Sequence, residues 1–189
     1  MEAASTTSVV RAGLERACVQ FSAGISGYGF ARTKKMFWTR LNQHTIDFVH
    51  FHRSGSSYGA PSSASVAIRV HFGIRVLNDT FAAQALNGPY SDSPTTSAGR
   101  YHLRFNASTG STYERCIEDL HRLFKEIGLP WFQRFSDPAA LLELADSPLQ
   151  PDAKKLLQDA VLEDPVAEHV AASLKLFGVK AHAAHRADA

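Results

Sequence analysis

Five cationic or titratable side chains lie two or four residues apart within two segments, residues 66–76 and 101–105. Both segments alternate between apolar and polar positions. Because side chains alternate between the two faces of a strand, each set points to one face. Like charges brought close together favour an anion, a nucleic acid or an acidic partner. This pattern predicts a candidate anion-binding or partner-binding face made of Arg69, His71, Arg75, His102 and Arg104.

Two other interpretations of this face stay open. It is also typical of a solvated outer face, in which each arginine pairs with an acidic side chain from elsewhere in the fold. Nucleic-acid-binding sheets interleave exposed aromatic rings with their basic residues. Here Phe72, Tyr101 and Phe105 alternate onto the apolar face instead, which disfavours nucleic acid as the partner.

A metal site is a further alternative, centred on the strand histidines His50 and His52. Two imidazoles at this spacing share one face of a strand and can hold a transition metal. A third ligand would come from His71, His102 or Asp47, but no second motif supplies one at fixed spacing. The long loop after this strand also leaves the strand register undetermined. The sequence therefore predicts no metal centre, with His50 and His52 as the residues to examine.

Two glycine-containing motifs lack the neighbouring helix or strand that their chemistry requires. Gly55-Ser56-Ser57-Tyr58-Gly59 matches G-x-S-x-G, but a nucleophile elbow needs a helix directly after it, and another strand follows here. The three glycines between Gly24 and Gly29 follow a helix, where a phosphate loop requires a strand. We therefore expect no catalytic residue and no cofactor.

Length and composition indicate one ordinary globular domain over residues 1–189, with 44% hydrophobic and 20% charged residues. The two cysteines, Cys18 and Cys116, cannot form a disulfide framework. A single bridge between them stays open as an alternative, but we expect both to be reduced and buried. The N-terminus lacks the pattern of a signal peptide, and no apolar run approaches the roughly 18 residues of a membrane span. These features predict a cytoplasmic, bacterial protein with no membrane partner.

The net charge of +2 hides an uneven distribution along the chain. Residues 30–105 contain nine Lys or Arg and three Asp, whereas residues 106–189 contain nine Lys or Arg and thirteen Asp or Glu. Either the two regions attract each other within one fold, or the basic region faces an anionic partner.

Periodicity predicts the elements that must position these residues. We expect strands over residues 31–41, 45–53, 66–76 and 101–105, after a first helix capped by Ser8. A helical turn is expected over residues 81–86, a mobile loop over 87–100 and a frayed tail over 181–189.

The C-terminal part has helical periodicity. Ser111 and Glu114 have the spacing of a capping box, and Gly128 is the expected left-handed residue at the end of that helix. Asp137 caps a short helix, and two more follow over residues 151–161 and 165–177. The order predicts an α+β fold, in which an antiparallel sheet of about four strands has the N-terminal helix and several C-terminal helices on its apolar face. The two sheet edges are compatible with a homodimer.

Three short patterns over about residues 9–145 resemble a bacterial family, domain of unknown function 4304. They are Gly29-Phe30 with Lys34, Lys35 and Phe37; Phe51-His52-Arg53-Ser54 with Phe72-Gly73; and Gly128-Leu129-Pro130-Trp131 with Phe135-Ser136-Asp137. The family pattern has Gln where His52 stands and Asn where His71 stands. The resemblance implies a single-domain bacterial protein and transfers no activity or catalytic residue.

Together these observations predict a non-catalytic binding or interaction module that uses its basic sheet face to engage an acidic protein or an anionic ligand. A small enzyme or metal-binding protein centred on the strand histidines is the first alternative, and nucleic-acid binding is the second.

Overall fold

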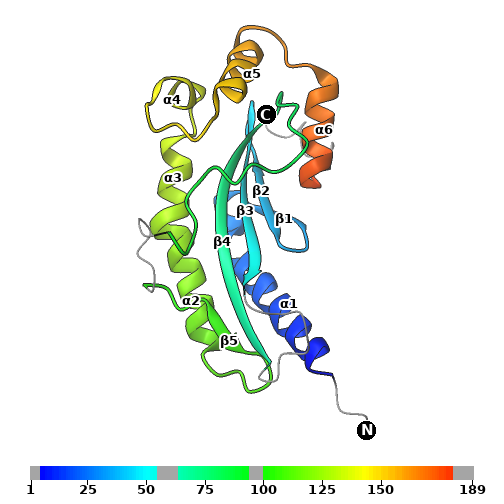
Figure 1. Ribbon diagram of the computed structural model, residues 1–189, viewed down its shortest axis with the longest axis vertical. Coiled ribbons are helices and arrows are strands. Elements are labelled where there is room, and N and C mark those ends of the chain that lie inside the picture. The colour runs from blue at the N-terminus through cyan, green and yellow to red at the C-terminus, as the bar shows by residue number, and fades with distance from the viewer. Residues whose placement is uncertain (1–4, 55–63, 94–99, 181–189) are drawn as a thin grey trace.

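The computed structural model describes residues 5–54, 64–93 and 100–180, and it confirms an antiparallel α+β fold (Figure 1). Five strands pair in chain order. They are β1 (Ala31–Lys34), β2 (Phe37–Leu41), β3 (Thr45–Ser54), β4 (Ser65–Val76) and β5 (Arg104–Asn106). The count exceeds the predicted four because residues 31–41 form a hairpin rather than one strand, turning at Lys35 and Met36.

The helices flank the sheet in sequence. The long helix α1 (Thr6–Ile25) and one 3-10 turn, η1 (Ser26–Tyr28), precede the sheet, and the remaining helices follow it. The latter are α2 (Tyr113–Leu123), the π-helical turn η3 (Phe124–Gly128), α3 (Leu129–Arg134), α4 (Pro138–Glu143), α5 (Pro151–Leu162) and α6 (Ala167–Phe177). None of the helices in the described part of the chain is long and apolar enough to cross a membrane.

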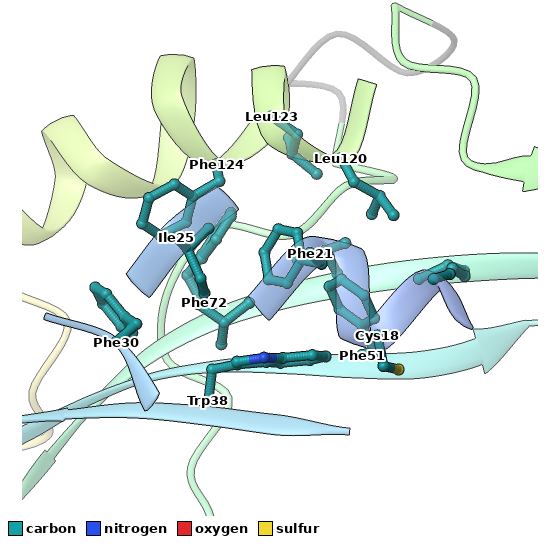
Figure 2. Packing of buried hydrophobic residues seen from close by; sticks show 14 of the residues in the cluster. Cys18, Phe21, Ile25, Phe30, Trp38, Phe51, Phe72, Leu120, Leu123 and Phe124 are labelled. Carbon is teal, nitrogen blue, oxygen red and sulfur yellow. The ribbon is translucent and has the colours of Figure 1, made fainter. Parts of the chain in front are cut away.

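The main core lies on the apolar face of the sheet, which we call the first face. In Figure 2, α1 lies between the strands and the α2–η3 helix, and Phe21 points into the space they enclose. The Phe21 ring centroid lies 4.6 Å from that of Phe51, 5.0 Å from that of Trp38 and 6.2 Å from that of Phe124. Such aromatic packing buries much apolar area per residue and fixes α1 against the sheet.

Helix α6 covers one end of the opposite face, which we call the second face. Phe177 of α6 is fully buried there against Phe37, Ile46 and Phe48. The segment that follows β4 crosses the sheet beside α6 (Figure 1). The second face is therefore covered at the end where β4 finishes, whereas no described helix covers its other end.

Several local predictions were wrong. The first helix is capped by Ser5, whose side chain accepts from the Ser8 amide, and not by Ser8. The capping box does not form, because Thr112 is the N-cap, with φ of 62° and no side-chain cap hydrogen bond. Residues 81–86 contain no helical turn, and the last strand covers only Arg104–Asn106.

Gly128 does not end a helix in the left-handed conformation. Its φ is −66°, and the chain continues through η3 directly into α3. By contrast, the Asp137 side chain accepts from the Ala139 amide as a cap, as predicted, and Gly178 ends α6 with φ of 70°. The expected frayed tail, residues 181–189, and part of the expected mobile loop, residues 94–99, lie outside the described residues.

Candidate binding face of the sheet

Strand register settles which histidines share a face. His50 of β3 pairs with His71 of β4, and His52 pairs with Arg69. On the other side of β4, Arg104 of β5 pairs with Ala67. Because paired residues point to the same side of a sheet, these side chains share the second face. We call the part of the second face that carries His50, His52, Arg69, His71 and Arg104 the open face.

Four rings form a row across the sheet at the border of the open face. His50 is stacked on Phe37, with ring centroids 4.2 Å apart, and His71 is stacked on Tyr90 at 5.5 Å. The two imidazole centroids are 6.5 Å apart. Tyr90 reaches this row because it forms an isolated bridge with His71 at the outer edge of β4. No sequence pattern indicated this position, since Tyr90 belongs to a segment expected to be a mobile loop.

Burial sets the protonation state of the two paired imidazoles. It lowers the pKa of His50 to about 4, with smaller contributions from His71 and His52. Burial also lowers the pKa of His71, and the neighbouring Arg69 acts in the same direction. Both imidazoles are therefore neutral near pH 7 and add no charge to that of Arg69 and Arg104.

Arg69 is paired with a carboxylate of its own chain. Its Nε donates to Asp92 Oδ2 at 2.7 Å, and both side chains remain substantially exposed, at 40% and 48%. Asp92 is held in place by the Ser91 hydroxyl, which donates to Asp92 Oδ1 at 2.9 Å. The backbone N–H of Ser91 in turn donates to the Val70 carbonyl at 2.9 Å, so this segment is attached to the edge of β4.

Arg104 provides the second cation of the open face. Its side chain is exposed and forms no ion pair with another residue in the ranges that the structure describes. His102 lies before β5, outside the regular alternation, and its backbone N–H donates to Asp119 Oδ2 at 2.8 Å. The structure therefore brings Arg104 to the open face but does not place His102 on it by strand geometry.

Arg75 does not belong to the open face, although its side chain points to the same side of the sheet. It lies six residues from Arg69, about 20 Å along the strand, and only 3% of its surface is exposed. Its guanidinium pairs with Asp79 at 3.1 Å and donates to the Ser173 hydroxyl at 3.2 Å. It also donates to the Asp79 carbonyl at 2.6 Å and to the Ala83 carbonyl at 3.3 Å. Arg75 thus holds α6 and the segment after β4 against the sheet.

The strand histidines form no metal centre with the other residues that the structure describes. The ring centroids of His50 and His52 are 6.1 Å apart, and within the described ranges no three His, Cys, Asp or Glu side chains form a group that could hold a metal ion. Asp47, a candidate third ligand, lies on the first face, where Arg40 donates to its carboxylate at 2.7 Å. The G-x-S-x-G motif at residues 55–59 lies outside the described residues.

A pocket lies beside Arg75 that was not predicted from the sequence. It has a volume of about 470 Å³ and is formed by β4, the segment after it and α5. No sequence signal could identify this pocket, because its walls come from segments about 75 residues apart in the chain.

No family model, curated protein or solved structure matches this chain. The resemblance to domain of unknown function 4304 therefore stays a prediction, and a function has to be argued from the geometry of the chain itself.

Proposed function

We propose that the protein is a non-catalytic binding module whose open face engages a carboxylate-bearing segment of an acidic partner protein. One observation carries this proposal: the chain's own Asp92 already places a carboxylate on Arg69. That contact indicates which chemical group this part of the sheet accepts.

The ion pair between Arg69 and Asp92 is weak enough for a carboxylate of a partner to take the place of Asp92. Exposed ion pairs contribute only about 0–1 kcal/mol, because water and salt compete for both charges. A carboxylate from a partner can therefore replace Asp92 at little cost, since the guanidinium offers the same planar donors to either group. Arg104 adds a second guanidinium that no carboxylate of the described chain neutralises.

The neutral imidazoles favour a protein segment over a free inorganic anion. His50 and His71 offer aromatic surface and hydrogen-bonding nitrogen atoms beside the two arginines. A peptide carries both carboxylates for the arginines and amide or apolar groups for the rings.

We also infer a cytoplasmic location in a bacterium. Cys18 and Cys116 are buried and unpaired, and free thiols are typical of a reducing compartment.

The proposal can be tested by titrating the protein with a synthetic peptide of alternating Glu and Ala, at low and moderate salt. Arg69→Glu and Arg104→Glu should each weaken binding about tenfold, because they place like charges opposite the peptide. Asp92→Asn should instead strengthen binding by about two- to fivefold, since it removes the internal competitor for Arg69. Arg11→Glu is the matched control, because Arg11 is exposed on α1, outside the second face.

Two outcomes would contradict the proposal. If Arg11→Glu weakens binding as much as Arg104→Glu does, the peptide responds only to net charge. If oligothymidylate binds more tightly than the peptide, and loses affinity in Arg69→Glu, the open face is a nucleic-acid surface instead, with Tyr90 and His71 as stacking rings.

A further inference from the structure

The pocket beside Arg75 has the size and lining of a small-molecule site. Its volume of about 470 Å³ lies within the range of about 300–1,000 Å³ found for ligand pockets. Ile74, Val76 and Leu149 form buried apolar walls, and Ala153 and Leu156 of α5 also line the pocket. A ligand that enters this pocket therefore meets mainly aliphatic carbon.

An exposed aromatic ring borders the pocket. Phe81 lines it and is 59% exposed, although large apolar side chains are usually covered. The Phe81 backbone N–H donates to Asp79 Oδ1 at 2.9 Å, and Asp79 pairs with the buried Arg75. The ring is thus attached to an anchored backbone at the border of the pocket, where it can contact a flat apolar group.

The charged groups of the pocket decide which ligand it favours. The charges of Arg75 and Asp79 compensate each other, and the Arg75 guanidinium donates its hydrogen bonds to Ser173, Ala83 and Asp79 rather than to a ligand. Asp152 also lines the pocket, is exposed, and forms no ion pair in the ranges that the structure describes. One negative charge is therefore left for a ligand to neutralise.

We propose that this pocket binds a small molecule with an apolar ring and a protonated amine, the ring lying between Phe81 and the aliphatic walls and the amine facing Asp152. This site differs from the open face in position and in charge, so it stands independently of the proposed acidic partner.

A second pocket, of about 570 Å³, is lined by the same segment after β4 and by α6. Comparing the two pockets indicates which of them favours a cationic ligand. The second pocket shares Arg75, Asp79 and Phe81 with the first pocket. However, Lys34 and Lys175 line it as well, and they outnumber its one further carboxylate, Glu168, so this pocket is less favourable for an amine. The cationic ligand is therefore expected in the pocket that contains Asp152.

The test is calorimetric titration of the full chain with three probes of one ring system: tryptamine, indole and indole-3-propionate. Tryptamine should bind about fivefold more tightly than indole, the size expected for one exposed charge pair, and indole-3-propionate should bind most weakly. Asp152→Asn should abolish the preference for tryptamine over indole and leave indole binding unchanged. Asp159→Asn is the matched control, because Asp159 is exposed on the same helix and does not line the pocket.

Two further variants locate the binding. Ala153→Trp should fill the pocket and eliminate binding of tryptamine and indole, and Phe81→Ser should weaken both without disturbing the core, because Phe81 is exposed. Absence of saturable binding by tryptamine and indole would overturn the proposal, and so would tightest binding by indole-3-propionate. Equal effects of Asp152→Asn and Asp159→Asn would likewise overturn the role assigned to Asp152.

Discussion

His50 and His71 face each other across β3 and β4, with ring centroids 6.5 Å apart, and each is stacked on another aromatic ring. Protonation of either imidazole places a charge in a partly buried row beside a second titratable ring. The pair therefore links the electrostatics of the open face to the stability of the sheet that carries it.

The protein should lose stability as the pH falls below 6.5. The unfolded chain takes up a proton at His50 near the ordinary pKa of about 6.5, whereas burial in the folded state lowers this pKa to about 4. The His50 contribution to the free energy of unfolding is thus fully present above pH 6.5 and is lost progressively between pH 6.5 and 4. At pH 5 the loss should be about 1–2 kcal/mol, measured by urea denaturation.

His50→Phe is the variant that isolates this contribution. It keeps a ring against Phe37 and removes the proton, so the difference in stability between pH 7 and pH 5 should shrink. A smaller dependence should remain, because burial also lowers the pKa of His71 and of His121. An unchanged difference in this variant would show that His50 is not the group that responds.

The sequence predicted the antiparallel sheet because residues 66–76 alternate without interruption, and that period is a local property of the chain. It could not separate Arg69 from Arg75, which occupy equivalent positions in the same alternation. Their difference is tertiary, since Arg75 is buried by α6, whose Ser173 lies 98 residues away in the sequence. The pairing of His50 with His71 likewise depended on register, which no local pattern determines.

Loss of the Arg75 guanidinium should destabilise the protein. Arg75→Met leaves the Asp79 carboxylate and two backbone carbonyls without their donor, and should cost about 3 kcal/mol in urea denaturation. Hydrogen exchange should accelerate for the amides of residues 79–85, which Arg75 holds against the sheet. In the double variant with Asp79→Asn, part of the loss should be recovered.

Arg115→Met provides the control for this variant. Arg115 is 68% exposed, and its nitrogen lies 3.9 Å from Asp119, so its removal should change stability by less than about 0.5 kcal/mol. Equal losses in the Arg75 and Arg115 variants would contradict the structural role of Arg75.

Gly128→Ala should destabilise the protein, although alanine is the better helix former. A Cβ atom at position 128 would lie 2.5 Å from Cε1 of Phe72, a fully buried ring. Such overpacking costs about 1–3 kcal/mol, more than the roughly 0.5–1 kcal/mol that alanine contributes in a helix. The sequence rule that assigns glycine to a helix end could not detect this, because the reason for the glycine is a ring on β4.

Gly27→Ala is the matched control for the Gly128 variant, since a Cβ atom there would meet no atom within 4 Å. Combining Gly128→Ala with Phe72→Leu should cost less than the sum of the two single losses, because the smaller side chain frees the space that the added methyl needs. Strict additivity of the thermal unfolding data would refute this account.

Cys18 and Cys116 should resist thiol reagents in the folded protein. Burial raises the pKa of the Cys18 thiol to about 11 and that of the Cys116 thiol to about 12, and the thiolate is the form that reacts. At pH 8, Ellman's reagent should label both thiols only as fast as the contact between α1 and α2 opens, and it should label both promptly in guanidinium chloride.

A thiol added at the exposed position 23 of α1, Ala23→Cys, is the control. It should react at once, which shows that the reagent is active. Prompt labelling of either native thiol without denaturant would mean that α1 and α2 separate readily, and the core in Figure 2 would then be less tightly closed than its packing indicates.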